Sequence, residues 1–372
     1  MGRKTLYVLI CLVLVIGLVL GACAAPAPAP APAPAPKPVP AEPGLPTLHL
    51  RLGSPHPEGM YGSIIGAALV DILPAMTDGK ITLEYYPIGV LGGTKENIEL
   101  THAGQIEMAV APAGFLGAFV PEVNVFNLDY IIPTAHEAVL WVANEGSAVR
   151  VFDEIFAEAG FKYISGSNVG AIFRSSNKPL RTMADFDGFK MRVMPSPILL
   201  ENYKALGANP TPLDFGEVYS GLQTGVIEGQ ENPISVAQSM RFAEVQSHWG
   251  MHYNRTFLFT NVANLAWWNS LPDKVKGIFM EAWRIADGLG MENELRDNVK
   301  VEKILPDINP DAVIYYLTAE EIKPLREAGE QVWDIVRDPD VGGPRGGDVL
   351  DALIADLATA EEKFGKLHDI PE

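Results

Sequence analysis

Cysteine and positive charge are both scarce in this chain, and each shortage excludes functions. The two cysteines, Cys11 and Cys23, lie near the start, so the chain beyond them can form no disulfide framework, cysteine-ligated zinc site or cysteine nucleophile. Lys and Arg number 28 against 46 Asp and Glu, which gives a formal net charge of −18. A chain this acidic repels phosphate backbones, so we expect no nucleic-acid partner.

Signatures of catalysis are also missing. The sequence has no G-x-S-x-G elbow, no G-x-x-x-x-G-K-[ST] loop and no G-x-G-x-x-G after a predicted strand. His248 and His252 are four residues apart, but Gly250 and the flanking aromatic residues predict an extended segment, which does not place both on one helical face. We therefore predict no enzyme, no cofactor and no metal site. An extracytoplasmic enzyme stays the alternative, which turnover assays would distinguish.

The first 22 residues have the pattern of a signal peptide. Arg3 and Lys4 precede an unbroken apolar run, Leu6–Ala22, which ends in small residues directly before Cys23. The tetrad Leu-Gly-Ala-Cys at 20–23 resembles the bacterial lipobox. This resemblance implies cleavage before Cys23 and lipidation of its sulfur, which would hold the body outside the cytoplasm on a membrane surface. The alternative is an uncleaved membrane anchor, because the run is near the lower limit for spanning a bilayer.

Residues 23–45 form a predicted tether. From residue 24 onward alanine and proline alternate, and proline in this density prevents both helices and central strands. Such a segment should adopt an extended polyproline-type conformation. About 20 residues at ~3.1 Å each would place the body ~60 Å from the membrane.

The rest of the chain alternates predicted strands and helices, which is typical of an α/β fold with parallel or mixed sheets. Its length favours two lobes over one. Strands are expected at 47–54, 81–86, 106–111, 161–167, 171–175 and 189–193, and helices at 61–76, 95–103, 136–144, 149–158, 196–206, 215–223, 272–304, 318–336 and 347–367.

Three segments resemble a known family. They are YPIGVLGGTKENIELTHAGQIEMAV at 86–110, DFDGFKMRVMPSP at 185–197, and FGEVYSGLQTGVIEGQENP at 215–233. In this order they are similar to the solute-binding receptors of TRAP transporters (tripartite ATP-independent periplasmic transporters) of the DctP type. The third segment is the most specific, because E-V-Y, L-Q-x-G and G-Q-E-N-P occur in one register.

The resemblance implies a two-lobed, periplasmic-binding-protein-like clamshell with mixed sheets, hinge strands and a long lobe-spanning helix. It places the first lobe at 46–169 plus 258–297 and the second at 170–257 plus 298–372. Closure of the lobes around a ligand would be a hinge motion.

Arg192 is the leading candidate for a ligand contact. It ends an apolar strand, and its planar guanidinium can hold a carboxylate through two parallel hydrogen bonds. From the residues alone, an exposed arginine or an internal ion pair is the simpler interpretation, whereas the resemblance implies the carboxylate clamp. Asn232 matches the family's pocket asparagine, with a turn-forming role before Pro233 as the alternative. Phe215 matches an aromatic residue that lines the family's site, with a core position as the alternative.

The chain departs from sialic-acid and some dicarboxylate receptors of the family. Ile172 stands where those receptors have a second arginine, and Arg174 lies two residues on, on the same strand face, where it could substitute in part or else point to solvent. Pro112 replaces an acidic pocket residue, and Pro195 stands where a polar residue can occur. These losses favour a monocarboxylate with an apolar or aromatic body.

Weaker candidates complete the predicted site. Trp268, near the expected crossing between lobes, is a candidate for the apolar wall, and Ser54 and His56 follow the first strand. We expect at most one of the adjacent tryptophans Trp267 and Trp268 to face the pocket if they lie on a strand.

The predicted function is capture of an organic acid outside the cytoplasm and delivery to the small and large TRAP membrane subunits. Because the sequence has no ATP-binding motif, the resemblance implies uptake driven by an ion gradient. The alternatives are a ligand receptor for a membrane sensor, or binding of a C4-dicarboxylate or a sugar acid.

Overall fold

The computed structural model describes residues 44–132 and 135–365. The predicted signal peptide, Cys23 and the tether up to residue 43 lie outside the described residues. In the described part, no helix has the length and apolar character needed to cross a membrane.

Nine strands are found among the described residues. They are β1 (Leu48–Gly53), β2 (Ile81–Tyr86), β3 (Met108–Ala109), β4 (Phe161–Ser176), β5 (Lys190–Val193), β6 (Asn209–Pro212), β7 (Gln230–Asn232), β8 (His248–Asn264) and β9 (Val313–Tyr316).

Helices alternate with these strands along most of the chain. The α-helices are α2 (Tyr61–Met76), α3 (Thr94–His102), α4 (Ala113–Leu116), α5 (His136–Asn144), α6 (Ser147–Glu158), α7 (Met183–Phe186), α8 (Pro197–Ala205), α9 (Val218–Thr224), α10 (Val236–Ser239), α11 (Leu265–Ser270), α12 (Asp273–Ile308), α13 (Ala319–Glu330), α14 (Pro339–Gly342) and α15 (Gly346–Phe364). The 3-10 helices are η1 (Pro121–Asn127), η2 (Phe215–Glu217), η3 (Phe242–Glu244) and η4 (Trp333–Arg337).

A mixed sheet runs through both ends of the fold in the order β2-β1-β3-β8-β4-β7, with β9 beside β8, while β5 and β6 pair separately. The long antiparallel strands β4 and β8 connect its two ends. At one end β3 pairs with Val262 and Ala263, near the end of β8. At the other end β9 pairs with the first four residues of β8, and β7 pairs with the last part of β4.

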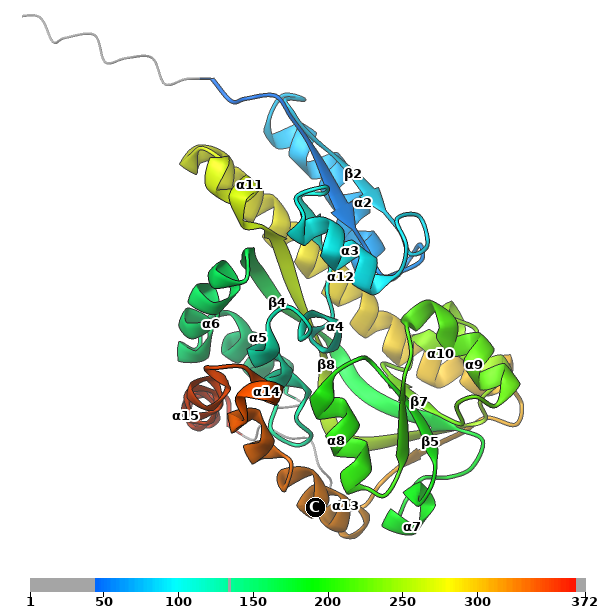
Figure 1. Ribbon diagram of the computed structural model, residues 1–372. Helices are drawn as coiled ribbons and strands as arrows, with labels where there is room; N and C mark the ends of the chain where they lie inside the picture. Colours follow the sequence, from blue (N-terminus) through cyan, green and yellow to red (C-terminus); the bar gives the residue numbers. More distant parts are fainter. Residues whose placement is uncertain (1–43, 133–134, 366–372) are drawn as a thin grey trace, which may run out of the picture. The chain divides into compact units, whose positions relative to one another are not determined.

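Two lobes follow from this pairing. The first lobe contains β1, β2 and β3 with α2 and α3, and the second contains β5, β6, β7 and β9 with α8, α9 and α10 (Figure 1). Helix α12, which is 36 residues long, packs against α2, β4 and α10 and so contacts elements of both lobes. The predicted two-lobed α/β fold with a long spanning helix is confirmed, while the predicted residue ranges of the lobes stay a prediction.

Helix α2 shows how the sequence pattern positions the first lobe. Tyr61, Ile65, Leu69 and Leu73 recur at every fourth residue and are all buried, which places one apolar stripe of the helix against the core. The same face meets α12 at Gly290, where an added Cβ would lie 3.0 Å from the Tyr61 ring. Any larger residue at this crossing would require Tyr61 or Ile65 to shift by a few tenths of an ångström.

Strand β4 corrects one expectation. The sequence pattern predicts two strands, 161–167 and 171–175, but β4 is continuous over 161–176. Its register with β8 shifts between Asn168 and Ala171, and Gly170 adopts a positive φ of 113°. This irregularity interrupts the alternation of side chains by which a strand is predicted from sequence. The pairing with β8 is nevertheless present both before and after it.

Candidate functional site

A small cavity lies where the two lobes meet, with about 280 Å³ of space between its lining atoms, part of which is open to solvent. We call it the Arg192 chamber. Its walls come from the loop after β1, the start of α3, the region of α4, the end of β5, η2, β7 and β8. The lining residues are Pro55, His56, Thr94, Pro112, Phe115, Arg192, Met194, Phe215, Asn232, Phe257 and Phe259.

A second chamber of about 250 Å³ adjoins the first. Five residues line both chambers: His56, Phe215, Asn232, Phe257 and Phe259. We call the second one the Glu294 chamber, because Glu294 of α12 lies in its wall together with Met60, Tyr61, Val169, Pro233 and Val236. The space in each chamber that the centre of a water-sized sphere can reach is only about 20 Å³, far below the range usual for small-molecule sites, about 300–1,000 Å³, so a bound molecule larger than water requires the lobes to move apart.

Arg192 provides the positive charge of the first chamber. Its side chain is 1% exposed, and its Nε and Nη2 both donate to the carbonyl oxygen of Leu213, at 3.0 and 2.7 Å. No hydrogen bond joins its Nη1 to any of the described residues. Burial lowers the pKa of Arg192 to about 10, although the nearby Asp214 opposes the shift. The guanidinium is therefore charged near neutral pH and has donors left for an anion.

Asn232 and Thr94 add polar atoms to the wall. The Asn232 Nδ2 donates to Gln230 Oε1, and its Oδ1 has no hydrogen bond to the described residues. Thr94 begins α3 and is 1% exposed, and its buried Oγ1 has no hydrogen-bond partner there either. Since buried polar atoms are normally paired, these two side chains are suited to a polar group of a bound molecule.

His56 contributes a neutral donor. Its Nδ1 accepts a hydrogen bond from the backbone N–H of Gly62 at 2.9 Å. A backbone N–H can only donate, so the ring proton must be on Nε2. Burial lowers the pKa of His56 to about 3, which keeps the ring uncharged at neutral pH. His56 therefore offers an N–H group without adding a second positive charge.

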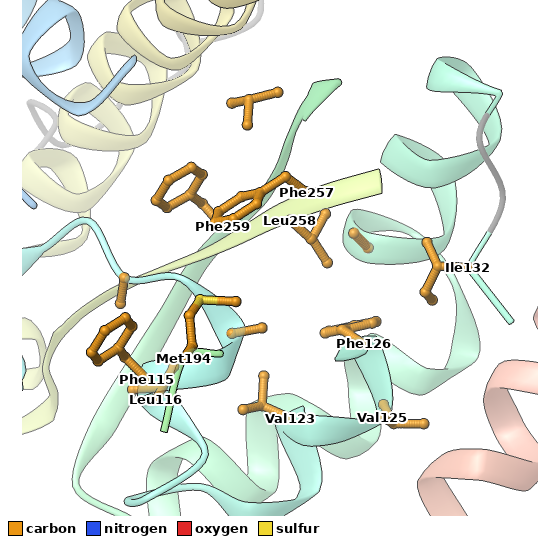
Figure 2. Packing of buried hydrophobic residues seen from close by; sticks show 14 of the residues in the cluster. Phe115, Leu116, Val123, Val125, Phe126, Ile132, Met194, Phe257, Leu258 and Phe259 are labelled. Carbon is orange, nitrogen blue, oxygen red and sulfur yellow. The ribbon is translucent and has the colours of Figure 1, made fainter. Parts of the chain in front are cut away.

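Aromatic and aliphatic side chains form most of the remaining wall. Phe257 and Phe259 lie on the same face of β8, because alternate strand residues point the same way, and Leu258 lies on the other (Figure 2). Their ring centroids are 5.2 Å apart. The Phe215 and His56 ring centroids are 6.3 Å apart in an edge-to-face contact. The cavity is thus apolar apart from a few polar groups.

The structure brings Arg192, Asn232, Phe215 and His56 together, as well as Pro112. Pro195 lines an adjacent open depression that shares Phe115 with the Arg192 chamber. Ser54 lies outside the lining, and its Oγ accepts a hydrogen bond from the His56 backbone N–H at 3.2 Å. Ser54 therefore positions the His56 loop.

Ile172 and Trp268 do not line either chamber. Ile172 is a buried core residue of β4. Trp267 and Trp268 lie on helix α11 rather than a strand, and the Trp268 ring packs 5.8 Å from Phe279 of α12. Asn264 caps this helix by accepting a hydrogen bond from the Trp267 backbone N–H. The cap turns the chain into a helix directly after β8, which moves both tryptophans away from the lobe interface.

Arg174 lines neither chamber and is 1% exposed, so in this structure it neither faces the cavity nor points to solvent. Its Nη2 donates to Asp129 Oδ2 at 2.9 Å, and its Nε donates to the Tyr203 hydroxyl at 2.9 Å. Arg255 pairs with Asp129 and with Glu231. These four side chains are at most 4% exposed, and we call them the four-charge cluster. Buried acidic residues hold the Arg174 side chain in this structure.

The sequence did not single out Thr94, Glu294 or the pair Phe257 and Phe259. The only local signal for the two phenylalanines is their i, i+2 spacing in an apolar segment. Thr94 and Glu294 look like ordinary helical residues, and the contact between lobes that brings them to the cavity has no local pattern. In the described part of the chain, no group of three or more His, Cys, Asp or Glu is arranged to hold a metal ion.

Two lobes joined by long strands and one helix, with a buried arginine in a small apolar cavity between them, define a solute-binding receptor. Residues 64–338 match the family described as bacterial extracellular solute-binding protein, family 7. The chain belongs to this DctP family of TRAP-transporter periplasmic solute-binding proteins. Its members are transport receptors and not enzymes.

Individual relatives agree with this assignment. The chain is 31% identical to the ectoine/5-hydroxyectoine-binding periplasmic protein UehA of Ruegeria pomeroyi over 77% of this chain and 84% of that protein. It is 32% identical to the C4-dicarboxylate-binding periplasmic protein DctP of Rhodobacter capsulatus over 73% and 80%. The periplasmic ectoine-binding protein of the TeaABC TRAP transporter of Halomonas elongata has a similar structure, with a TM-score of 0.79 at 28% identity, covering 84% of this chain and 99% of that chain.

Proposed function

We propose that the protein captures an organic monocarboxylate with an apolar or aromatic body and delivers it to the small and large TRAP membrane subunits for ion-gradient-driven uptake. The observation that supports this most is Arg192, which is buried and charged and has an unpaired Nη1 in a mostly apolar cavity. A buried guanidinium without a carboxylate partner is costly, and a ligand carboxylate would supply one.

The cavity walls argue for the body of this ligand. Apart from Arg192, the polar groups of its chamber are His56, Thr94 and Asn232, while most other lining residues are phenylalanine, methionine or proline. Such a wall favours a compact molecule with one carboxylate over one with many hydroxyl groups, because each unpaired hydroxyl loses its water on burial. C4-dicarboxylate and sugar-acid ligands stay the alternatives.

Titration calorimetry with a carboxylate panel tests the proposal. The panel contains ectoine, succinate, orotate, glucuronate and simple aliphatic and aromatic monocarboxylates. Arg192→Met should weaken binding of the ligand that the panel identifies by about 10- to 100-fold, because hydrogen bonds to a charged group contribute about 1.5–3 kcal/mol. Lys190→Met is the matched control, since Lys190 lies two residues away on β5 and is exposed.

Each result has a definite meaning. Binding that persists unchanged in Arg192→Met would remove Arg192 from the site. Strong binding of succinate or glucuronate alone would refute the monocarboxylate, and no binding by any carboxylate would refute the proposed receptor function. Circular dichroism of each variant without ligand separates loss of binding from loss of folding.

The lipid anchor is a separate part of the proposal. Cys23 follows Leu-Gly-Ala in a lipobox-like tetrad, and we infer that its thiol carries the lipid that holds the protein at the extracytoplasmic membrane surface. Cys23→Ser should release the protein from the membrane fraction and abolish metabolic labelling with a radioactive fatty acid. Labelling that persists in the variant would exclude Cys23 as the modified residue.

A further inference from the structure

Glu294 is a buried carboxylate in the wall of the cavity. It belongs to α12, is 3% exposed and lines the Glu294 chamber. Its Oε2 accepts a hydrogen bond from the Tyr61 backbone N–H at 3.0 Å, and its Oε1 accepts one from the Ser235 hydroxyl. Within the described residues no Lys, Arg or His forms an ion pair with it. Its charged neighbour is Asp297, a second carboxylate.

This surrounding is unfavourable to an isolated negative charge. Burial, with a smaller contribution from Asp297, raises the pKa of Glu294, while the two hydrogen bonds oppose the shift. Carboxylates in protein interiors are normally paired with a cation. A cation inside the Glu294 chamber would supply the missing partner.

The other walls of the chamber also suit a cation. Tyr61, Phe215, Phe257 and Phe259 line it, and the Tyr61 and Phe259 ring centroids are 4.7 Å apart. The faces of aromatic rings attract ammonium groups, and clusters of such rings bind quaternary ammonium ions. His56 Nδ1 accepts a hydrogen bond from a backbone N–H, and burial lowers the pKa of the ring, so an uncharged His56 does not repel a cation there.

A guanidinium and a carboxyl group therefore line two adjoining chambers, Arg192 in one and Glu294 in the other, and the chambers share five side chains. We propose that the ligand is a zwitterion: its carboxylate binds Arg192, and a compact cationic nitrogen group, an ammonium or amidinium, lies among the aromatic rings beside Glu294. This inference rests on the proposed receptor function and narrows its substrate class. Asn232, which lines both chambers, would contact the middle of the ligand.

A purely structural role for Glu294 makes a different prediction. Its two hydrogen bonds join the start of α2 and the residue before α10 to α12, so Glu294 helps to hold both lobes on the long helix. Loss of these bonds alone would lower stability without changing which ligand is preferred. Ligand selectivity therefore distinguishes the two roles.

Pairs of isosteric probes measure this selectivity. The first member of each pair is an ω-trimethylammonio carboxylate with one to four methylene groups, and the second replaces the trimethylammonium by a tert-butyl group. The two members have nearly the same shape and the same carboxylate, and they differ only in the positive charge. Titration calorimetry at neutral pH gives the ratio of their dissociation constants for the full-length protein.

The expected result is that at least one cationic member binds tenfold or more tightly than its tert-butyl partner. Glu294→Gln should bring this ratio close to one and leave the affinity for the tert-butyl member nearly unchanged. Glu292→Gln is the matched control, because Glu292 lies on the same helix and is exposed, and it should keep the wild-type ratio. Since the ratio compares two ligands on one variant, a partly unfolded preparation does not change it.

Other outcomes overturn the inference. Equal or tighter binding of the tert-butyl members, or an unchanged ratio in Glu294→Gln, would show that no cation lies beside Glu294. Binding of only non-zwitterionic carboxylates, lost in Arg192→Met, would refute the zwitterion while the receptor function stands. Absence of binding to every carboxylate would refute both.

Discussion

Replacing Arg174 with methionine should strongly destabilise the protein. The four-charge cluster contains two arginines and two carboxylates, so it is neutral as a whole. Arg174→Met leaves Arg255 to balance both Asp129 and Glu231. The Tyr203 hydroxyl, which donates to Glu231, would also lose its bond from the Arg174 Nε.

The magnitude follows from the burial of the cluster. Removing one partner from a buried ion pair costs about 3–5 kcal/mol, because the remaining charge has no water to solvate it. Arg174 and Asp129 are 1% and 4% exposed, so the full range applies. Asp129→Asn added to Arg174→Met restores neutrality and keeps a carbonyl acceptor. The double variant should therefore be less destabilised than the sum of the two single variants, by at least about 1 kcal/mol.

Urea unfolding followed by tryptophan fluorescence measures these changes. Arg326→Met is the control, because Arg326 pairs with Glu330 at a site where the two side chains are 42% and 39% exposed. Exposed ion pairs contribute little to stability, so this variant should unfold close to the wild-type midpoint. A loss below about 1 kcal/mol in Arg174→Met, or strict additivity in the double variant, would refute the unpaired-charge argument.

Three shorter predictions concern other buried groups. The pKa of His56 falls from 6.5 to about 3 on folding, so the unfolded chain binds more protons than the folded chain between these pH values. The free energy of unfolding should therefore fall by about 2 kcal/mol through this group as the pH drops from 7 to 5. Urea unfolding of His56→Gln should show a correspondingly smaller drop, and an equal drop would contradict the assignment. Gly66→Ala should lower the free energy of unfolding by about 1–3 kcal/mol, because a Cβ at this position would lie 2.3 Å from the Tyr85 ring. Calorimetry should show a lower melting temperature, and an unchanged midpoint would contradict this prediction. Asp356→Ala should lower the free energy of unfolding by about 1–3 kcal/mol, because Asp356 of α15 accepts hydrogen bonds from Ser147 N, Ser147 Oγ and Ala148 N at the start of α6. The urea midpoint measures this loss, and Asp356→Asn should recover part of it.

The sequence predicts those elements whose side-chain pattern is complete within the segment. Helix 61–76, strand 81–86 and helix 136–144 match α2, β2 and α5 at both ends. In α2 the apolar stripe repeats every four residues, and in β2 the buried residues alternate. Patterns of this kind need no information from the rest of the fold.

Elements that depend on distant contacts were harder to predict. Strand β8 is buried on both faces for most of its 17 residues, so it lacks the polar alternation that marks a strand. Helix η1 was not predicted, because it buries the polar residues Glu122, Asn124 and Asn127, and some of their hydrogen-bond partners lie elsewhere in the chain. Asn124, for example, accepts a hydrogen bond from the Ser196 hydroxyl at 2.7 Å.

The residues of the candidate site also fall into those that the sequence predicts and those whose contacts it does not predict. Arg192, Asn232 and Phe215 were found because they lie in motifs that resemble a family, and they do line the cavity. For Arg174 strand geometry left two positions open, because two residues along β4 from Ile172 keep the same face, but Asp129 of a distant loop holds the guanidinium. Strand position predicts the direction of a side chain and not the partner that it finds there.

Burial of both Arg192 and Glu294 has a consequence for lobe closure in the receptor that we propose. Separation of the lobes would return both groups to water, whereas in this structure neither forms an ion pair with a described residue. A ligand shifts such an equilibrium only by its difference in affinity for the two forms. A zwitterion pairs both charges at once in the closed form, so it should favour closure more than a monocarboxylate that pairs Arg192 alone. The two buried charges would then make closure itself depend on the correct ligand.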